Sequence, residues 1–449
     1  MAQRLKGSSP PRHLSRNIPA PSGPDQRKQS HTAYVPVILL VLALASASCS
    51  TGRPTLSGEV EVLGSWSGEE LSAFREVVAP FEDRTGVSVT YATTRDLRGV
   101  LAGRLAEDDP PDISGLEGPA HMAELAAAGE LRDLSPVLEI GAYRSRVAPT
   151  FIELGTVDGR LVGVFVRSSL KGLIWYNPSV FQLGSPRTWD ELQRMAIQAG
   201  GEAAAEWCLG LESEESSGWP GTDLIEQFLL REAGVQAYDR WTAGDLPWTS
   251  PEVRRAFELF GQVTADVSVY GGSHSAVETD FREAGAPLFE DPPGCLFLHQ
   301  GSFMPVFFRA GEERRAGVDY DFFPFPALVP EAPTSVIGGG DLFGLLTDDP
   351  AAAELIRYLV SDEAQTIWAA QGGSLSVNAG VTDYADPVSR RAAELLTGAD
   401  LFRFDASDRM PPTVSAAFRT AVLEFAADHA RLDAILREVE AVRHAEYAP

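Results

Sequence analysis

A strand, a helix and a second strand follow one another near the start of the folded part of this chain. The segment "GEVEVLGSW" (58–66) alternates apolar and polar residues as a strand does, and the next segment places Phe74, Val77 and Phe81 at helical spacing. Gly86 ends that helix, and "VSVTYA" reads as the second strand. Such a βαβ unit has a right-handed crossover, so the sequence predicts an α/β fold.

The rest of the chain repeats this pattern and then changes it. From about residue 157 two extended runs appear, "GRLVGVFVRSS" and "LKGLIWYN", and Thr188 is placed to cap the helix that follows. Strands return at "GCLFLHQG" and "DYDFFPFPAL", with helices at about 351–371 and 388–397 and from 413 onward. This order predicts two lobes joined by more than one crossing strand, with a ligand cleft between them.

The first 48 residues differ from the others in charge. They carry six basic residues and one acidic residue, a net charge of +5, whereas the whole chain carries −26 and the remainder therefore −31. Within these 48 residues, an apolar run of about a dozen residues comes after the basic start; it is too short to span a bilayer and is typical of a signal peptide. Small residues then precede Cys49, which resembles the lipidated cysteine of a bacterial lipoprotein signal, although Ser46 stands where that pattern prefers Leu.

Ordinary signal cleavage and a single N-terminal membrane anchor are the alternatives to lipidation, and all three place residues 50–449 outside the cytoplasm. The acidic surplus repels phosphate backbones, so we expect no nucleic-acid partner. With Cys49 lipidated, Cys208 and Cys295 form an even pair in an oxidising compartment, which predicts a disulfide; two buried free thiols are the alternative. The remaining histidines are scattered, so we expect no metal site and no cofactor.

Several segments together resemble the extracellular solute-binding proteins of ABC importers, above all the alpha-glucoside-binding branch of the sugar binders. These segments are "EWCLGLESEESSGWPGTDLIEQFLLREAG" (206–234), "FREAGAPLFEDPPGCLFLHQGSF" (281–303), "DYDFFPFP" and "GGGDLFGLL". The resemblance covers nearly all of residues 58–445. It implies a protein without enzymatic activity that closes around an oligosaccharide by a hinge motion and delivers it to a membrane permease.

By this resemblance the chain is expected to divide into a signal peptide (1–48), a tether (49–57), a first lobe (57–165 and 335–382) and a second lobe (168–330 and 385–449). A lipid anchor is expected on Cys49. We also expect a monomer, because ligand-driven closure needs no second subunit. The competing hypotheses are a secreted glycoside hydrolase with a carboxylate pair and an adhesion or scaffold lipoprotein. The sequence leaves open which sugar is bound, with maltose, trehalose, sucrose and longer α-glucosides as candidates.

Sugar sites combine aromatic rings, which stack on the apolar face of a pyranose, with charged and amide groups that bond its hydroxyls. In the first lobe Trp66 follows a strand and is the leading candidate for stacking, with Ser67 and Glu69 beside it at a helix start. Glu117 and Arg95 each follow another strand of this lobe. Local packing is the alternative for Trp66, and plain surface exposure is the alternative for the two charged residues.

The crossing segment and the second lobe supply further candidates. Arg167 and Lys171 lie in the hinge segment, and Lys171 is the only lysine after the signal peptide, which suggests a need for a compact ammonium group. Trp219, between Gly and Pro before a helix, and Phe303, at a strand end, are candidates for stacking, with packing as the alternative. The tryptophans assigned to packing alone are Trp207, Trp241 and Trp248.

The glycine run before Asp341 matches neither GxGxxG nor a Walker A sequence. We interpret it as a crossing strand in which Gly339 and Gly340 let the backbone approach the sugar, while Asp341 accepts a hydroxyl bond. Asp405 and Asp408, in "FRFDASDRMP", resemble a cleft-facing loop of the family and are candidate hydroxyl acceptors. Turn capping is the alternative for both.

Overall fold

The structure, a computed structural model, describes residues 56, 58–200, 205–309, 313–329, 335–372 and 374–447, all within the unit Pro54–Pro449. The predicted signal peptide, the lipidation site Cys49 and most of the tether lie outside the described residues. Within the described part of the chain, no helix is long and apolar enough to cross a membrane.

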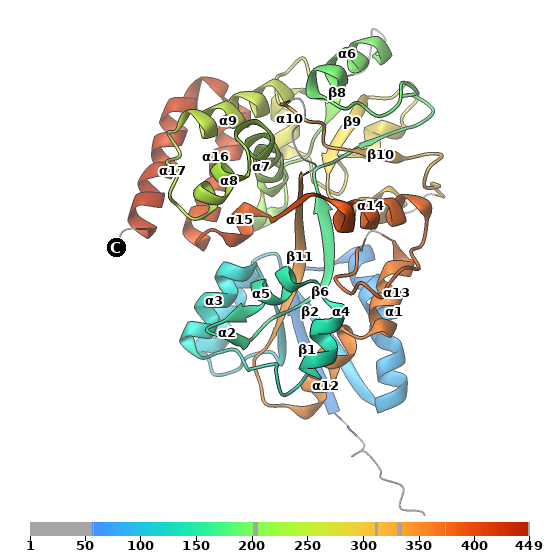
Figure 1. The fold of residues 1–449 in the computed structure, drawn as a ribbon, viewed down its shortest axis with the longest axis vertical. Coiled ribbons are helices and arrows are strands. Elements are labelled where there is room, and N and C mark those ends of the chain that lie inside the picture. The colour runs from blue at the N-terminus through green and yellow to red at the C-terminus, as the bar shows by residue number, and fades with distance from the viewer. Residues whose placement is uncertain are drawn as a thin grey trace, which may run out of the picture. The chain divides into compact units, whose positions relative to one another are not determined.

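The βαβ unit predicted from the sequence is the start of the first lobe (Figure 1). It consists of β1 (Gly58–Gly64), α1 (Gly68–Thr85) and β2 (Val87–Thr93), and the two strands are parallel. The apolar stripe of α1 is buried, and Gly86 ends the helix at φ 72°, a left-handed conformation that favours glycine. The unit continues into a sheet of order β12-β11-β3-β1-β2, with β6 paired to β11.

The remaining elements of the first lobe cover this sheet or belong to it. They are α2 (Leu97–Ala106), β3 (Ile113–Leu116), α3 (Pro119–Ala128), α4 (Ile140–Arg146), α5 (Pro149–Leu154), the hairpin β4 (Thr156–Val157) and β5 (Arg160–Leu161), β6 (Val164–Lys171), β11 (Ser335–Leu345), α12 (Pro350–Leu359) and α13 (Asp362–Gln371). Their apolar faces form one core, in which Phe74, Phe165 and Trp368 are among the largest side chains.

The second lobe has its own sheet, of order β10-β7-β9-β8, under a larger set of helices. Its strands are β7 (Leu173–Tyr176), β8 (Ala205–Cys208), β9 (Cys295–Gln300) and β10 (Asp321–Pro324), and β12 (Leu401–Phe404) leaves this lobe to pair with β11. Its helices are α6 (Trp189–Ala199), α7 (Trp219–Ala233), α8 (Val235–Thr242), α9 (Pro251–Val263), α10 (Gly272–Glu278), α11 (Pro305–Phe308), α14 (Pro387–Gly398), α15 (Ala406–Arg409), α16 (Pro412–Ala427) and α17 (Leu432–Glu446), with short 3-10 turns η1 (Glu214–Ser216), η2 (Ala286–Phe289) and η3 (His429–Arg431). Thr188 caps α6 as expected, its side chain accepting from the Glu191 amide.

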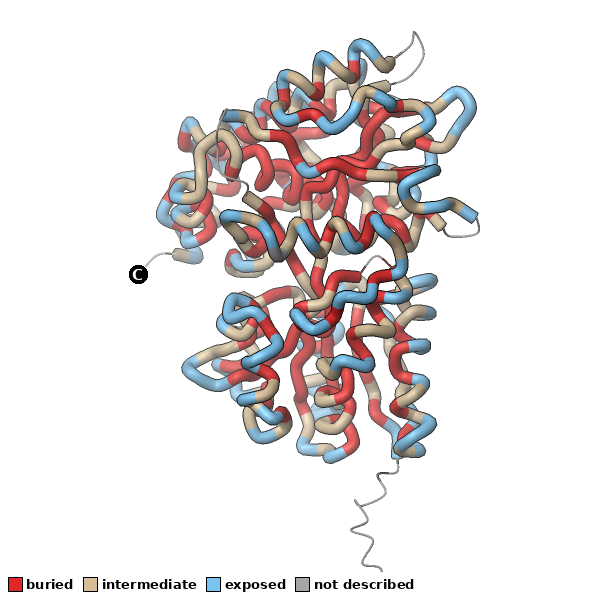
Figure 2. The backbone as a smooth tube through the Cα atoms, turned by 45° about the vertical axis from the view of Figure 1, so that its right-hand side comes forward, coloured by how far each residue is buried: buried red, intermediate tan, exposed pale blue. Residues whose placement is uncertain are grey.

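The two lobes are joined by β6 and β11, which run side by side and antiparallel from one to the other (Figure 1). Figure 2 shows buried residues gathered inside each lobe and along these crossing strands, with exposed residues on the outer helices. The α/β class and the two-lobed architecture predicted from the sequence are therefore confirmed.

The predicted disulfide is also confirmed, because Cys208 at the end of β8 is bonded to Cys295 at the start of β9, with their Cα atoms 5.5 Å apart. The bond closes a segment of the second lobe that contains α7 to α10. Cross-linking residues so distant in sequence restricts the unfolded chain and thereby favours the folded state.

Candidate functional site

A cavity of about 240 Å³ lies between the lobes beside the crossing strands. The sequence-predicted residues that line it are Trp66, Arg95, Glu117, Arg167, Lys171, Trp219, Phe303, Gly340, Asp341, Asp405 and Asp408. Ser67, Glu69 and Gly339 do not line it, and Glu69 is exposed. Lining residues that sequence reasoning missed are Ser65, Glu70, Leu97, Leu116, Ser169, Ser216, Asp223, Phe281, Ser407 and Arg419.

On the first-lobe side, Arg167 of β6 is held by two carboxylates. Its Nε donates to Asp341 Oδ2 at 2.5 Å and its Nη2 donates to Glu70 Oε1 at 2.8 Å. Burial alone would lower the pKa of Arg167, but Asp341 and Glu70 outweigh burial and raise it. The guanidinium also lies 5.2 Å from the centroid of the Trp66 ring. Arg167 is thus a fully paired cation that fixes the wall of the cavity.

Trp66 lines the cavity but is only 2% exposed. Its ring packs against Phe74, Tyr91, Phe343 and Trp368, with centroid distances between 5.1 and 5.8 Å. The Trp66 amide donates to the Tyr91 hydroxyl at 3.1 Å. These contacts favour the packing alternative for Trp66, and its stacking role stays a prediction.

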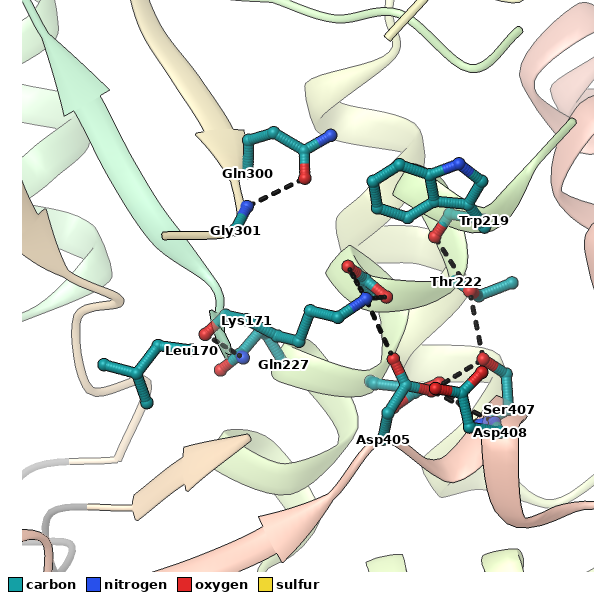
Figure 3. A network of polar contacts seen from close by, with 12 residues as sticks. Leu170, Lys171, Trp219, Thr222, Gln227, Gln300, Gly301, Asp405, Ser407 and Asp408 are labelled. Atoms are coloured by element: carbon teal, nitrogen blue, oxygen red, sulfur yellow. Dashed lines mark hydrogen bonds and ion pairs between the residues drawn. The ribbon is translucent and has the colours of Figure 1, made fainter. Parts of the chain in front are cut away.

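On the second-lobe side, Lys171 at the end of β6 reaches into a group of carboxylates (Figure 3). Its Nζ lies 2.9 Å from Asp223 Oδ2 and 3.3 Å from Asp405 Oδ2, and 4.9 Å from the centroid of the Trp219 ring. Burial alone would lower the pKa of Lys171, but Asp223, Asp405 and Asp408 outweigh burial and raise it. A compact ammonium fits between these groups, which gives a physical reason for the only lysine after Lys28 in the sequence.

Lys171 has more than one carboxyl group around its single ammonium group. Burial raises the pKa values of Asp223, Glu226 and Asp408 well above their usual range. Burial also acts to raise the pKa of Asp405, but Lys171 and hydrogen bonds to that carboxylate outweigh it, so the pKa of Asp405 is lowered. Asp405 is therefore the ionised partner of Lys171, while its neighbours retain protons more readily.

The loop after β12 is held by these same acids. Asp405 accepts from the Ser407 hydroxyl at 2.7 Å and from the Asp408 amide at 3.2 Å, so it does cap the turn that begins α15. Glu226 of α7 accepts from the Ala406 and Ser407 amides at 2.7 and 3.0 Å. The loop is consequently fixed with the Asp408 carboxyl toward the cavity.

The glycines of β11 have a packing reason that the sequence did not reveal. A Cβ on Gly340 would lie 2.7 Å from the Arg167 carbonyl oxygen, and one on Gly339 would lie 3.1 Å from Lys171 Cε. Their missing side chains thus make room for β6 and for the Lys171 side chain. Of the two glycines, Gly340 lines the cavity and Gly339 does not. The expected approach of the backbone to a sugar therefore stays a prediction for Gly340.

His299 of β9 lies in the core of the second lobe, 1% exposed, and neither ring nitrogen has a hydrogen-bond partner among the described residues. Burial, with Lys171 and Arg231 adding to it, lowers the pKa of His299 to about 3. The folded protein therefore keeps His299 neutral, whereas the unfolded chain takes up a proton below pH 6.5.

His299→Phe is consequently expected to flatten the pH dependence of stability. Below pH 6.5 the wild type loses about 1.4 kcal/mol of unfolding free energy per pH unit through this residue, or about 2 kcal/mol at pH 5. Urea titration at pH 7.5 and at pH 5 measures the unfolding free energy of both proteins. From pH 7.5 to pH 5, the wild type should lose about 2 kcal/mol more unfolding free energy than the variant. An equal loss in both proteins would contradict a buried neutral His299.

Comparison with known proteins shows what class of molecule carries this cavity. Residues 76–396 match the family model described as bacterial extracellular solute-binding protein. The chain belongs to this family. Extracellular solute-binding proteins bind and do not transform their ligands, so this protein is not an enzyme, and it acts outside the cytoplasm. The hydrolase alternative finds no support.

Individual members of the family agree with this assignment over most of their length. The osmoprotective compounds-binding protein GgtB of Synechocystis is 32% identical over 84% of this chain and 91% of its own. The alpha-glucosides-binding periplasmic protein AglE of Rhizobium meliloti is 33% identical over 81% of this chain and 82% of its own. Among solved structures, a chitin oligosaccharide binding protein superposes with a TM-score of 0.74 at 19% identity, covering 87% of this chain and 98% of that one, which shows the shared fold.

Proposed function

We propose that this solute-binding protein captures a neutral oligosaccharide, an α-glucoside such as trehalose, maltose or sucrose, between its lobes and delivers it to the permease of an ABC importer. The observation that most supports this proposal is that the charged groups of the cavity are paired beside an aromatic ring. Trp219 lines the cavity, and its cations Arg167 and Lys171 each lie within ion-pair distance of two carboxyl groups. The name of the relative AglE, an alpha-glucosides-binding protein, supports the same class of ligand.

Paired charges favour a neutral ligand over a charged one. An anionic ligand would have to compete with Asp341 or Asp405 for a cation that already has its partner. A cationic ligand would have to compete with Arg167 or Lys171 for those carboxylates, and a buried unpaired charge of either sign is costly. Hydroxyl groups, by contrast, bond to the outer lone pairs and N–H groups of such pairs without separating them. A sugar supplies those hydroxyls together with an apolar ring face.

In this proposal Trp219 and Phe303 stack on sugar rings, and both are partly exposed at the cavity. Hydroxyl bonds come from Arg95, Glu117, Asp341 and Asp408, with Gly340 in contact through its backbone. The pKa of Glu117 is raised by burial, against the opposing effect of Arg419. Ser67, Glu69 and Gly339 take no direct part. The lobe boundaries, the monomeric state and anchoring through a lipid on Cys49 belong to the same proposal.

Calorimetric titration of the purified protein with trehalose, sucrose and maltose tests this function. We expect one-to-one binding of at least one sugar, which is recovered unchanged afterwards. A matched control is trehalosamine, in which an amine replaces one hydroxyl of trehalose; if trehalose binds, the cationic analogue should bind at least tenfold more weakly. Absence of binding to all three sugars would contradict the α-glucoside assignment, and tighter binding of the cationic analogue would contradict a neutral ligand.

A further inference from the structure

The lobes also touch each other through an arginine that crosses the cleft. Arg95, in the first-lobe loop between β2 and α2, donates from Nη2 to the Ser213 hydroxyl at 2.5 Å. Its Nη1 donates to the Ser65 carbonyl oxygen at 3.4 Å, which holds the side chain to its own lobe. Ser213 precedes η1 in the second lobe and is fully buried. A side chain rooted in one lobe therefore ends on the other.

A second arginine crosses in the opposite direction. Arg282 of the second lobe donates from Nη1 to the Ser67 hydroxyl, at the start of α1 in the first lobe, at 3.4 Å. It is held in place by Asp280, which accepts from Nε at 2.8 Å and from Nη2 at 2.5 Å, and Glu214 lies 3.8 Å away. The two lobes thus exchange arginines, each ending on a serine of the other.

Phe281 lies beneath both arginines and connects them to the cavity. The Arg95 and Arg282 guanidinium carbons are 5.8 and 5.4 Å from the centroid of its ring. The same ring packs edge to face with Trp219, the centroids being 5.0 Å apart. Phe281 is 4% exposed and lines the cavity. The ring that lies against both crossing arginines therefore also packs on Trp219, one of the two rings proposed to stack on the sugar.

We propose that Arg95 with Ser213, and Arg282 with Ser67, form an interlobe clasp over Phe281 that stabilises the closed conformation and sets how slowly the ligand leaves. Opening the cleft separates both pairs, so the clasp contributes to the closed state alone and shifts the equilibrium between the two states. Ser213, Ser67 and Arg282 do not line the cavity, and they act as positioning residues for closure. The effect on ligand release rests on the proposed sugar binding, whereas the effect on closure does not.

Ser213→Ala tests the stronger half of the clasp. Loss of one hydrogen bond to a charged group should raise the dissociation rate of a bound sugar about tenfold in stopped-flow measurements, with little change in the association rate. Without sugar, the variant should have a larger radius of gyration in small-angle scattering than the wild type. Ser217→Ala is the matched control, because among the described residues its hydroxyl bonds within the same loop, to Glu214 and to the Ser213 amide. Its dissociation rate should stay within about twofold of the wild-type rate, and its radius of gyration should be unchanged.

Ser67→Ala tests the weaker half. The Ser67 side chain makes no capping bond to α1, so its removal leaves the helix start intact, and the dissociation rate should rise about two- to threefold. A dissociation rate of Ser213→Ala no different from that of Ser217→Ala would overturn the clasp. If no sugar of the panel binds, the proposed function fails on its own; scattering then decides the clasp, which an unchanged radius of gyration in Ser213→Ala would overturn.

Discussion

Replacing Lys171 with Met is expected to lower the free energy of unfolding by about 3–5 kcal/mol at pH 7.5. The Lys171 ammonium is bound by Asp223 and Asp405, which are 2% and 1% exposed, with Asp408 beside them. Methionine fills a similar volume but leaves the ionised Asp405 without its partner in a site that water scarcely reaches. Urea titration followed by circular dichroism measures the loss.

The size of this loss should depend on pH in a defined direction. Without Lys171 the pKa of Asp405 rises, as burial already raises the pKa values of Asp223 and Asp408. A carboxyl whose pKa is higher in the folded state than in the unfolded state favours folding at low pH and loses that advantage as the pH rises through its folded pKa. The difference between Lys171→Met and the wild type should therefore be smaller at pH 5 than at pH 7.5.

Arg84→Met is the matched control, because its salt bridge with Glu363 at 2.7 Å is exposed on both sides. Such surface pairs contribute about 0.5 kcal/mol, so this variant should unfold close to the wild type at both pH values. Lys171→Arg keeps the charge but not the compact shape, and should lie between the wild type and Lys171→Met. A Lys171→Met protein that unfolds together with Arg84→Met would show that the buried pairing has no net stabilising role.

Trp219→Ala is expected to weaken sugar binding about 30- to 150-fold while changing the melting temperature little. The Trp219 ring lines the cavity and is partly exposed there, so the change removes a stacking surface worth about 2–3 kcal/mol. Titration calorimetry measures the affinity. Trp219→Phe keeps a smaller ring and should retain part of it.

The control for this variant is Trp241→Phe, a change to a tryptophan of the same lobe that is buried in the core and does not line the cavity. Its sugar affinity should equal that of the wild type. An affinity of Trp219→Ala within threefold of the wild type would remove Trp219 from the site and return attention to Trp66, the residue that the sequence favoured.

The regular parts of the fold follow from local patterns in the sequence. The spacing of Phe74, Val77 and Phe81 predicted α1, Gly86 predicted its end, and Thr188 predicted the cap of α6. These signals depend on neighbours in the chain. The identity of the crossing strands needed the resemblance to a family, because pairing between β6 and β11 joins residues far apart in sequence.

The cavity shows where such reasoning stops. Glu69 was expected there and its neighbour Glu70 takes the place, since successive helical residues point about 100° apart and the orientation of α1 is set by packing. Asp223 had an available signal: it follows Trp219 by four residues on α7 and so shares its face. Phe281 had none, because it lies in an irregular segment between α10 and η2, where position depends on tertiary contacts alone.

The spacing of the two buried cations along β6 has a mechanical consequence. Arg167 is fastened to the first lobe and Lys171 to the second, and only about 13 Å of strand separates them. Where β6 and β11 cross between the lobes, rotation of one lobe on the other falls on this short ladder, in which Ser168, Ser169 and Leu170 pair with the three consecutive glycines of β11. Glycine permits backbone rotations that other residues resist. The part of the hinge formed by β6 and β11 is therefore only a few residues long, with an ion pair to a different lobe at each end and glycines between them.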